Sequence, residues 1–197
     1  MKRFSTITAA GVVATAAVLA QPSAGMAASA GTAGGTAAGT TAGTAAACST
    51  PWGSTRERAG AMSEAPLTDV RAGRHACFDR LVFDLDGSPV GYRVRYVSSV
   101  QQEGSADAVP LRGGAFLRVT LLDPAYDADG EATYDPADER ELVQVGSFRT
   151  LRQVAWAGSF EGQTTIGVGV RARLPFRAAV LTTATGSKLV VDVAHRW

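Results

Sequence analysis

The amino-acid sequence predicts an all-β fold, a single-domain β-sandwich of about seven or more strands. Apolar and polar residues alternate with a period of two through most of residues 79–195, which is typical of strands with one buried face. Gly, Pro and Asp at turns separate these runs, and no segment of ten or more residues in the domain follows the 3.6-residue period of a helix. Strands with one apolar face must bury it against a second sheet, and a closed barrel is the alternative.

Each expected strand follows from this alternation. "DRLVFDLDG" (79–87) and "AFLRVTLLDP" (115–124) place their apolar residues on one face, and "GYRVRYV" (91–97) places Arg93 and Arg95 opposite an apolar face. Further strands are expected at 163–174, 176–182 and 188–195, with one or two more within 141–156.

The chain is expected to have three parts. Residues 1–27 form a signal peptide, because the basic "MKR" precedes a mostly small and apolar run and then small residues that a signal peptidase accepts, after Ala27 or Ala30. This run is too short and too weakly apolar to span a membrane. Residues 28–47 are rich in Gly, Thr and Ala and form a disordered linker. Residues 48–197 form the folded domain, which we expect to be secreted and extracellular.

The two cysteines, Cys48 and Cys77, are expected to form a disulfide, since an even number of cysteines in an exported chain indicates a bridge. Two alternatives remain. Cys48 follows "TAAA" and could carry a lipid anchor, although it lies far beyond the apolar run. Cys77 could be a nucleophile with His75 as its base, which would require a free thiolate.

The charge of the chain is balanced. It carries 19 Lys and Arg against 18 Asp and Glu, and cleavage of the signal peptide would remove Lys2 and Arg3 but no acid. A nearly neutral domain lacks the basic patch that binds nucleic acid, and there is no polybasic run for a membrane surface. We therefore expect neither as a partner.

Outward-facing arginines are the best candidates for ligand binding. If the strands at 91–97 and 163–174 are neighbours, their arginines form one basic patch, and the arginine fork suits carboxylates and phosphates. Aromatic side chains, including Trp197, could offer faces to sugar rings. The alternative is that these side chains only cover solvated strand faces or pack in the core. The candidate residues are Arg93, Arg95, Arg171, Arg173, Tyr92 and Trp156.

A metal site is a weaker hypothesis. The first and last expected strands, "RLVFDLD" and "KLVVDVA", resemble each other, and if they lie side by side, His75 and His195 could be joint ligands. The alternative is that each histidine ends a strand and bonds locally. Neither HExxH nor CxxC spacing is present, and no serine stands in a Gly-x-Ser-x-Gly elbow. The sequence therefore predicts no cofactor and no catalytic residue.

The chain also resembles a known family over residues 52–195. Taken in order, "VRAGRHACFDRLVFDLDG", "GYRVRYV", "LRGGAFLRVTLLDPA", "GSFEGQTTIGVGV", "LPFR" and "KLVVDVAH" are similar to the AMIN-like domain of secreted actinobacterial proteins. That family is distantly related to the AMIN domain of cell-wall amidases and secretins. The resemblance implies a β-sandwich at the cell envelope that binds peptidoglycan or another anionic wall polymer without catalysis. A secreted metal-assisted or cysteine hydrolase, and a protein-binding exported module, are the alternatives.

Overall fold

The computed structural model describes residues 48–87 and 90–197, and these residues form strands and turns without a helix. The expected signal peptide and linker therefore lie outside the described residues. Within the described ranges, no helix is long and apolar enough to cross a membrane. The strands are β1 (Glu57–Ala59), β2 (Leu67–Arg74), β3 (Phe78–Leu85), β4 (Tyr92–Val97), β5 (Val100–Gln101), β6 (Ala108–Val109), β7 (Ala115–Leu121), β8 (Leu151–Phe160), β9 (Gln163–Val170), β10 (Phe176–Thr183) and β11 (Gly186–Ala194).

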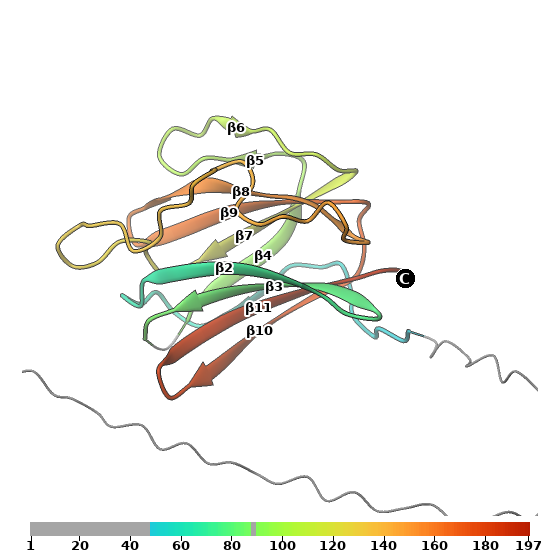
Figure 1. Ribbon diagram of the computed structural model, residues 1–197, viewed down its shortest axis with the longest axis horizontal. Coiled ribbons are helices and arrows are strands. Elements are labelled where there is room, and N and C mark those ends of the chain that lie inside the picture. Colours follow the sequence, from blue (N-terminus) through green and yellow to red (C-terminus); the bar gives the residue numbers. More distant parts are fainter. Residues whose placement is uncertain (1–47, 88–89) are drawn as a thin grey trace, which may run out of the picture. The chain divides into compact units, whose positions relative to one another are not determined.

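Two antiparallel sheets form the two layers seen in Figure 1. The five-stranded sheet has the order β1-β4-β7-β9-β8, and the four-stranded sheet has the order β10-β11-β3-β2. One core lies between them, with Phe83 and Leu189 from the smaller sheet and Leu117 and Ile166 from the larger sheet among its fully buried members. The predicted all-β sandwich is confirmed.

The predicted likeness of the first and last strong strands has a structural basis. β3 and β11 are antiparallel neighbours, with Leu189 opposite Phe83 in the core. On the outer face each strand carries an aspartate between two cations. Asp84 of β3 pairs with Arg71 and Lys188. The other aspartate, on β11, pairs with two arginines, as described next.

Asp192 links the four-stranded sheet to the segment that precedes β1. Its carboxylate is 1% exposed, and it accepts hydrogen bonds from Arg80 on β3 and Arg177 on β10. The Arg177 guanidinium lies 4.5 Å from the centre of the Trp52 ring, and Trp52 packs edge-on against Phe78 at 5.5 Å. The carboxylate is thus desolvated and fully paired, which is the condition under which a buried charge is tolerated.

One expected strand is shorter than predicted, and a second region holds one of the one or two strands expected there. The strand expected at 163–174 ends at Val170, because the chain must leave the five-stranded sheet before β10 joins the other sheet, and Pro175 cannot donate to a ladder. The region 141–156 contributes only β8, and the preceding residues run irregularly along its edge, where Leu142 donates its N–H to the carbonyl of Val154.

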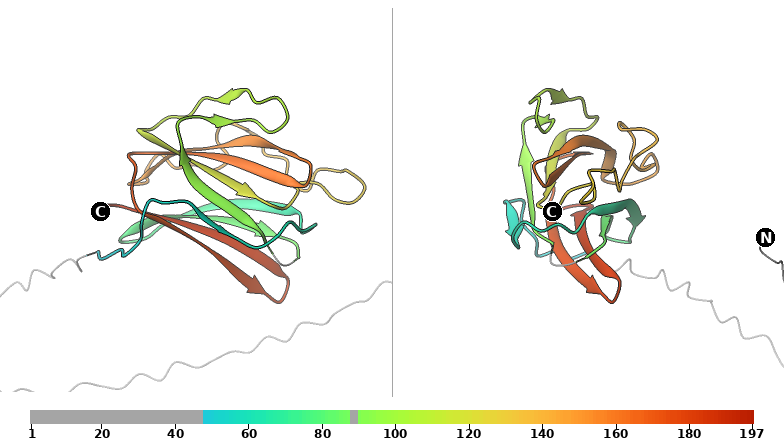
Figure 2. Two further views of the ribbon diagram at one scale, coloured as in Figure 1. Left: turned by 180° about the vertical axis from the view of Figure 1, so that it is seen from behind. Right: turned by 90° about the vertical axis from the view of Figure 1, so that its left-hand side faces the viewer.

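A flap covers part of the outer face of the five-stranded sheet. It consists of residues 98–112 and contains the β5–β6 hairpin, which lies outside both layers in Figures 1 and 2. Glycines on β9 permit this contact. A Cβ at Gly167 would lie 3.0 Å from Leu111, and one at Gly169 would lie 1.9 Å from the carbonyl oxygen of Arg112.

The expected disulfide joins Cys48 to Cys77, with a Cα–Cα distance of 5.3 Å, and no described cysteine is free. Cys77 precedes β3, so the bridge fixes the start of the domain to the central strands of the smaller sheet. A bridged sulfur is neither a lipid acceptor nor a thiolate. Both the lipid anchor on Cys48 and the cysteine nucleophile at Cys77 are therefore wrong for this structure.

Replacement of both cysteines by alanine should lower the free energy of unfolding by about 3–4 kcal/mol, since the bridge closes a loop with a sequence separation of 29 residues. Urea unfolding of the oxidised protein and of the Cys48→Ala/Cys77→Ala variant measures the difference. A loss of under about 1 kcal/mol would contradict this entropic account.

Gly169→Ala should destabilise the domain by about 1–3 kcal/mol, because the new methyl group would overlap the backbone of Arg112 in the flap. Gly146→Ala is the matched control, since nothing lies within 4 Å of a Cβ there. Thermal unfolding of the two variants should show a loss for the first only, and equal effects would argue against a tight contact of the flap.

Candidate functional site: an arginine face on the larger sheet

Four arginines lie on the outer face of the five-stranded sheet, and we call Arg58, Arg93, Arg95 and Arg118 the arginine face. Arg58 on β1 is opposite Arg93 on β4, and Arg95 on β4 is opposite Arg118 on β7. Residues opposite each other in register share a face of the sheet. The intervening Val94 points into the core and is fully buried, so the alternation along β4 directs Arg93 and Arg95 outward, as predicted.

A small cavity of about 180 Å³ lies beside three of these arginines, next to the flap. On one side Glu103 of the flap pairs with Arg118 at 2.5 Å and accepts a hydrogen bond from Thr165. On the other side Arg93 donates to the amide oxygen of Gln163 at 3.2 Å. The residues that line the cavity are Arg93, Arg95, Glu103, Arg118, Thr120 and Gln163.

The residues that line this cavity carry excess positive charge, with three arginines against one glutamate. Glu103 is the one carboxylate among the described residues that line it, and it is already paired with Arg118. No hydrogen bond or salt bridge joins the side chain of Arg58 or Arg95 to another described residue. Free guanidinium forks bind carboxylates and phosphates in bidentate fashion. The arrangement is therefore suited to an anionic ligand.

The arginines at 171 and 173 do not join this surface. β7 lies between β4 and β9, so the strands expected to be neighbours are separated, and Arg171 and Arg173 lie in the bend after β9. Arg171 donates to the carbonyl of His195 at 2.7 Å. Arg173 donates to Ser54. The single four-arginine patch of Arg93, Arg95, Arg171 and Arg173 is not formed.

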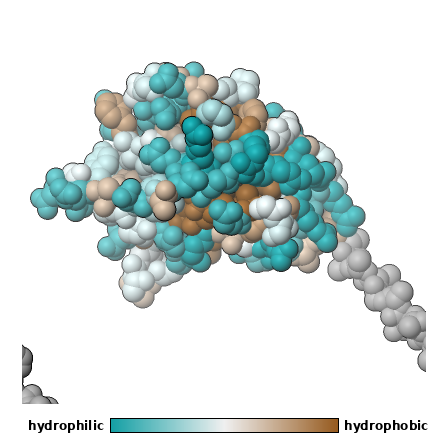
Figure 3. All heavy atoms as spheres, turned by 45° about the horizontal axis from the view of Figure 1, so that its top comes forward, coloured by the Kyte–Doolittle hydropathy of each residue, from teal (hydrophilic) through white to brown (hydrophobic). Residues whose placement is uncertain are grey.

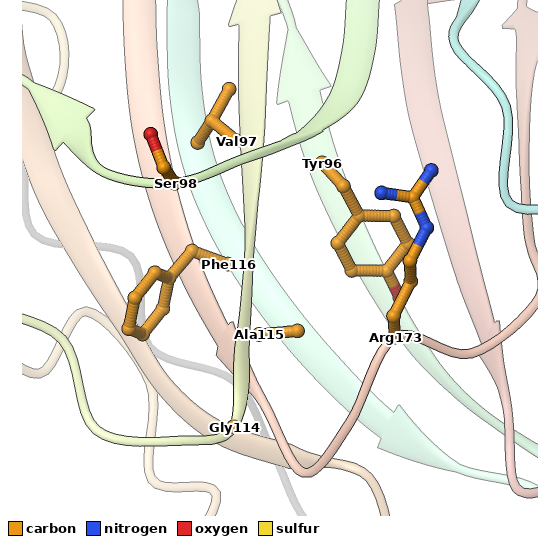
Figure 4. A pocket seen from close by; sticks show the side chains of 7 residues that line it. All are labelled: Tyr96, Val97, Ser98, Gly114, Ala115, Phe116 and Arg173. Carbon is orange, nitrogen blue, oxygen red and sulfur yellow. The ribbon is translucent and has the colours of Figure 1, made fainter.

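Arg173 belongs to a different hollow, shown in Figure 4. Its guanidinium lies 4.9 Å from the centre of the Tyr96 ring and covers that ring, while Phe116 points away on the other side of β7. The hollow has a volume of about 390 Å³. Since the Tyr96 hydroxyl also bonds to Leu174, both side chains contribute to the link between β4 and the bend after β9.

The aromatic candidates lie away from the arginine face. Tyr92 is 6% exposed, and its hydroxyl donates to the carbonyl of Ala178 on the edge strand β10. Trp156 is opposite the buried Ile166 and packs against Tyr134 with the ring centres 5.7 Å apart. Both therefore face the interior, on the opposite side of the sheet from Arg93.

Trp197 is 71% exposed, and its indole N–H donates to the carbonyl of Arg173. It lies beside the bend after β9 rather than on the arginine face. A stacking role with sugars at the arginine face is thus not supported for any of the three aromatic candidates.

The two histidines lie at one end of the sandwich, because β3 and β11 are neighbours as the metal hypothesis required. His195 is joined to Asp79 and His75 stacks on Phe78 with ring centres 4.5 Å apart. Both line one cavity. No group of three or more His, Cys, Asp or Glu placed to hold a metal ion occurs within 48–87 and 90–197.

Three residues of the site were not predicted from the sequence. Arg118 alternates with the apolar residues of "AFLRVTLL", so the period of two could have placed it outward. Arg58 lies on a strand of three residues, too short to show a period. Glu103 reaches the site only because the flap folds over the sheet, and no local pattern encodes that contact.

Polar residues dominate the surface seen in Figure 3, where apolar residues appear only as small areas between hydrophilic ones. On this face the domain therefore offers hydrogen bonds and charges rather than an apolar docking area.

The model of the AMIN-like domain family matches residues 65–195. The chain belongs to the AMIN-like domain family. Membership suggests a peptidoglycan-associated or envelope-binding module, and AMIN-like domains generally bind without catalysis and occur in secreted or periplasmic proteins. Searches of curated proteins and of solved structures gave no match.

The AMIN-like domain also contains an isolated buried carboxyl group, Asp123, at the end of β7. Asp123 is fully buried and Ser63 donates to its Oδ1, whereas no described residue forms a hydrogen bond with its Oδ2. Burial raises the pKa of Asp123 to about 6, and the hydrogen bond from Ser63 opposes this rise. Ser63 in turn lines a surface cavity of about 670 Å³.

This raised pKa predicts how stability depends on pH. The folded protein holds a proton on Asp123 at pH values where the unfolded chain, with an ordinary pKa of 3.8, has released it. The stabilising contribution of Asp123 to the free energy of unfolding is thus fully present below about pH 4. It is lost as the pH rises through about 6. The loss is at most about 3 kcal/mol, at 1.36 kcal/mol per pKa unit.

Asp123→Asn should remove this part of the pH dependence, because asparagine does not titrate and can still accept from Ser63. Urea unfolding between pH 4 and 7.5 should show the stability of the variant rising relative to the wild type as the pH increases. Asp127→Asn is the control at an exposed site. A constant difference between wild type and Asp123→Asn across this range would contradict the raised pKa.

Proposed function

We propose that this AMIN-like domain is a secreted, non-catalytic module that binds peptidoglycan or another anionic wall polymer through its arginine face. The observation that carries the proposal is the excess positive charge at the cavity beside Arg93, Arg95 and Arg118. Family membership supports an envelope location and a wall polymer as the class of ligand. The actinobacterial source that the sequence resemblance implies stays a prediction.

The position of these arginines suits a polymer rather than a small molecule. They lie beside the flap on the outer face of the sheet, across three neighbouring strands, and the adjoining cavity is only about 180 Å³. A linear chain with repeated anionic groups can contact several guanidiniums at once, and each added contact raises the overall affinity through effective concentration. Arginine keeps its charge at all physiological pH values.

A non-catalytic role is favoured by the chemistry of the described residues. The two cysteines are bridged and hold no thiolate. Among residues 48–87 and 90–197, no serine hydroxyl or cysteine thiol forms a hydrogen bond with the side chains of His195 and Asp79. We therefore assign the domain to binding.

Arg93→Ala/Arg95→Ala should reduce the affinity for purified peptidoglycan sacculi by about tenfold or more, since one hydrogen bond to a charged group contributes about 1.5–3 kcal/mol. Co-sedimentation over a range of protein concentrations measures the affinity. Binding should also weaken as salt is added, because exposed charges are screened.

Arg140→Ala/Arg196→Ala is the matched control, since it removes the same charge from exposed sites outside the arginine face. It should bind sacculi as the wild type does. Absence of binding by the wild type would refute a wall-binding function, whereas equal losses in the two variants would refute only the arginine face. Release of soluble wall fragments would indicate an enzyme instead.

A further inference from the structure

A second polar cavity lies at the end of the sandwich where β2 ends, β3 begins and β11 ends, next to the loop that precedes β8. We call it the end cavity. Its volume is about 300 Å³, and it shares no residue with the arginine face. It is lined by Arg74, His75, Ala76, Asp79, Ser147, Arg149 and His195.

A buried pair lies in its wall. Asp79 is fully buried, and its Oδ1 lies 3.0 Å from Nε2 of His195. Its Oδ2 accepts the backbone N–H groups of Thr150 at 2.6 Å and Leu151 at 3.2 Å. The carboxylate is therefore fully engaged, and it holds Nε2 of His195 as the hydrogen donor.

The other ring nitrogen of His195 has no hydrogen-bond partner in the part of the chain that the structure describes. The side chain of His195 is 9% exposed, and its Nδ1 is buried without a hydrogen bond. An unpaired buried polar atom is unfavourable, and native proteins satisfy most such atoms with protein, water or ligand. Nδ1 accepts a hydrogen bond in the neutral ring and donates one in the protonated ring.

Positive groups line the rest of the end cavity. Arg74 and Arg149 line it and are exposed, and Arg74 also makes a long hydrogen bond, 3.4 Å, to the carbonyl of Ser147. His75 is fixed against Phe78 by stacking. Asp79 is the only acid lining the cavity within the described residues, and its two oxygens are already engaged by His195 and by the N–H groups of Thr150 and Leu151. Two arginines disfavour a metal cation and favour an anion.

We propose that the end cavity binds a small oxyanion, a carboxylate or a phosphate group. Arg74 and Arg149 provide the charge-assisted hydrogen bonds, and the His195–Asp79 pair forms the base of the site. This inference is independent of the proposed function, because it uses none of the arginines of the arginine face.

The two histidines are the only ones in the chain, so NMR of their ring signals reports on this site directly. We would titrate the folded protein with inorganic phosphate and, separately, with acetate, at constant pH and ionic strength. The ring signals of His195 and His75 should shift and saturate, and the anion with the lower Kd identifies the class of ligand.

Arg74→Ala/Arg149→Ala should raise the Kd for that anion by about tenfold or more, while Arg93→Ala/Arg95→Ala, which leaves the end cavity intact, should not change it. Both arginines of the first pair are exposed, so the variant should retain the thermal stability of the wild type. Shifts that rise linearly without saturation, or an equal Kd in all three proteins, would overturn the proposal.

Zinc provides the opposing test. A carboxylate-bound histidine with a free second nitrogen is also the arrangement in which histidine binds metals. Stoichiometric binding of Zn²⁺ at the His195 ring, without saturable binding of either anion, would replace the oxyanion site by a metal site.

Discussion

The pairing of β3 with β11 is the interaction on which the rest of the domain depends. These two strands form the centre of the smaller sheet, and β11 is the last strand of the chain. Their pairing packs the apolar faces of both against the larger sheet. It places Asp192 between Arg80 and Arg177, and His195 next to Asp79. The disulfide attaches Cys48 to Cys77, which directly precedes β3. Loss of this pairing would therefore disturb the core, the buried charges and the end cavity together.

The outer faces of the two sheets differ in how their charges are arranged. On the smaller sheet Asp84 and Asp192 each pair with two cations, so all four of these cations have an acidic partner. On the larger sheet Glu103 pairs with Arg118, and no acidic residue within 48–87 and 90–197 pairs with the neighbouring arginines. A chain that is nearly neutral in total thus carries one face with excess positive charge. Because net charge averages over the surface, it conceals such a local excess.

The sequence predicts the parts of this structure that depend on local periodicity. The period of two places Arg93 and Arg95 outward and Leu81, Phe83 and Leu85 inward, and the export context predicts the disulfide. It does not predict which strands are neighbours, because pairing depends on contacts between residues far apart in the chain. For this reason the proximity expected between β4 and β9 is wrong, and the contact of Glu103 with Arg118 could not be foreseen.

The linkage at Cys77 also has a mechanical consequence. Cys48 is joined to Cys77 by the disulfide, and the carbonyl of Cys77 accepts the N–H of His195. A pull applied between residues 48 and 195 would thus act across two neighbouring points at one end of the β3–β11 ladder. Such a force opens an antiparallel ladder one pair at a time, beginning at Phe78 and Ala194. Such tension would first separate the residues around the end cavity. The arginine face lies on the other sheet, so this force would not act on it directly.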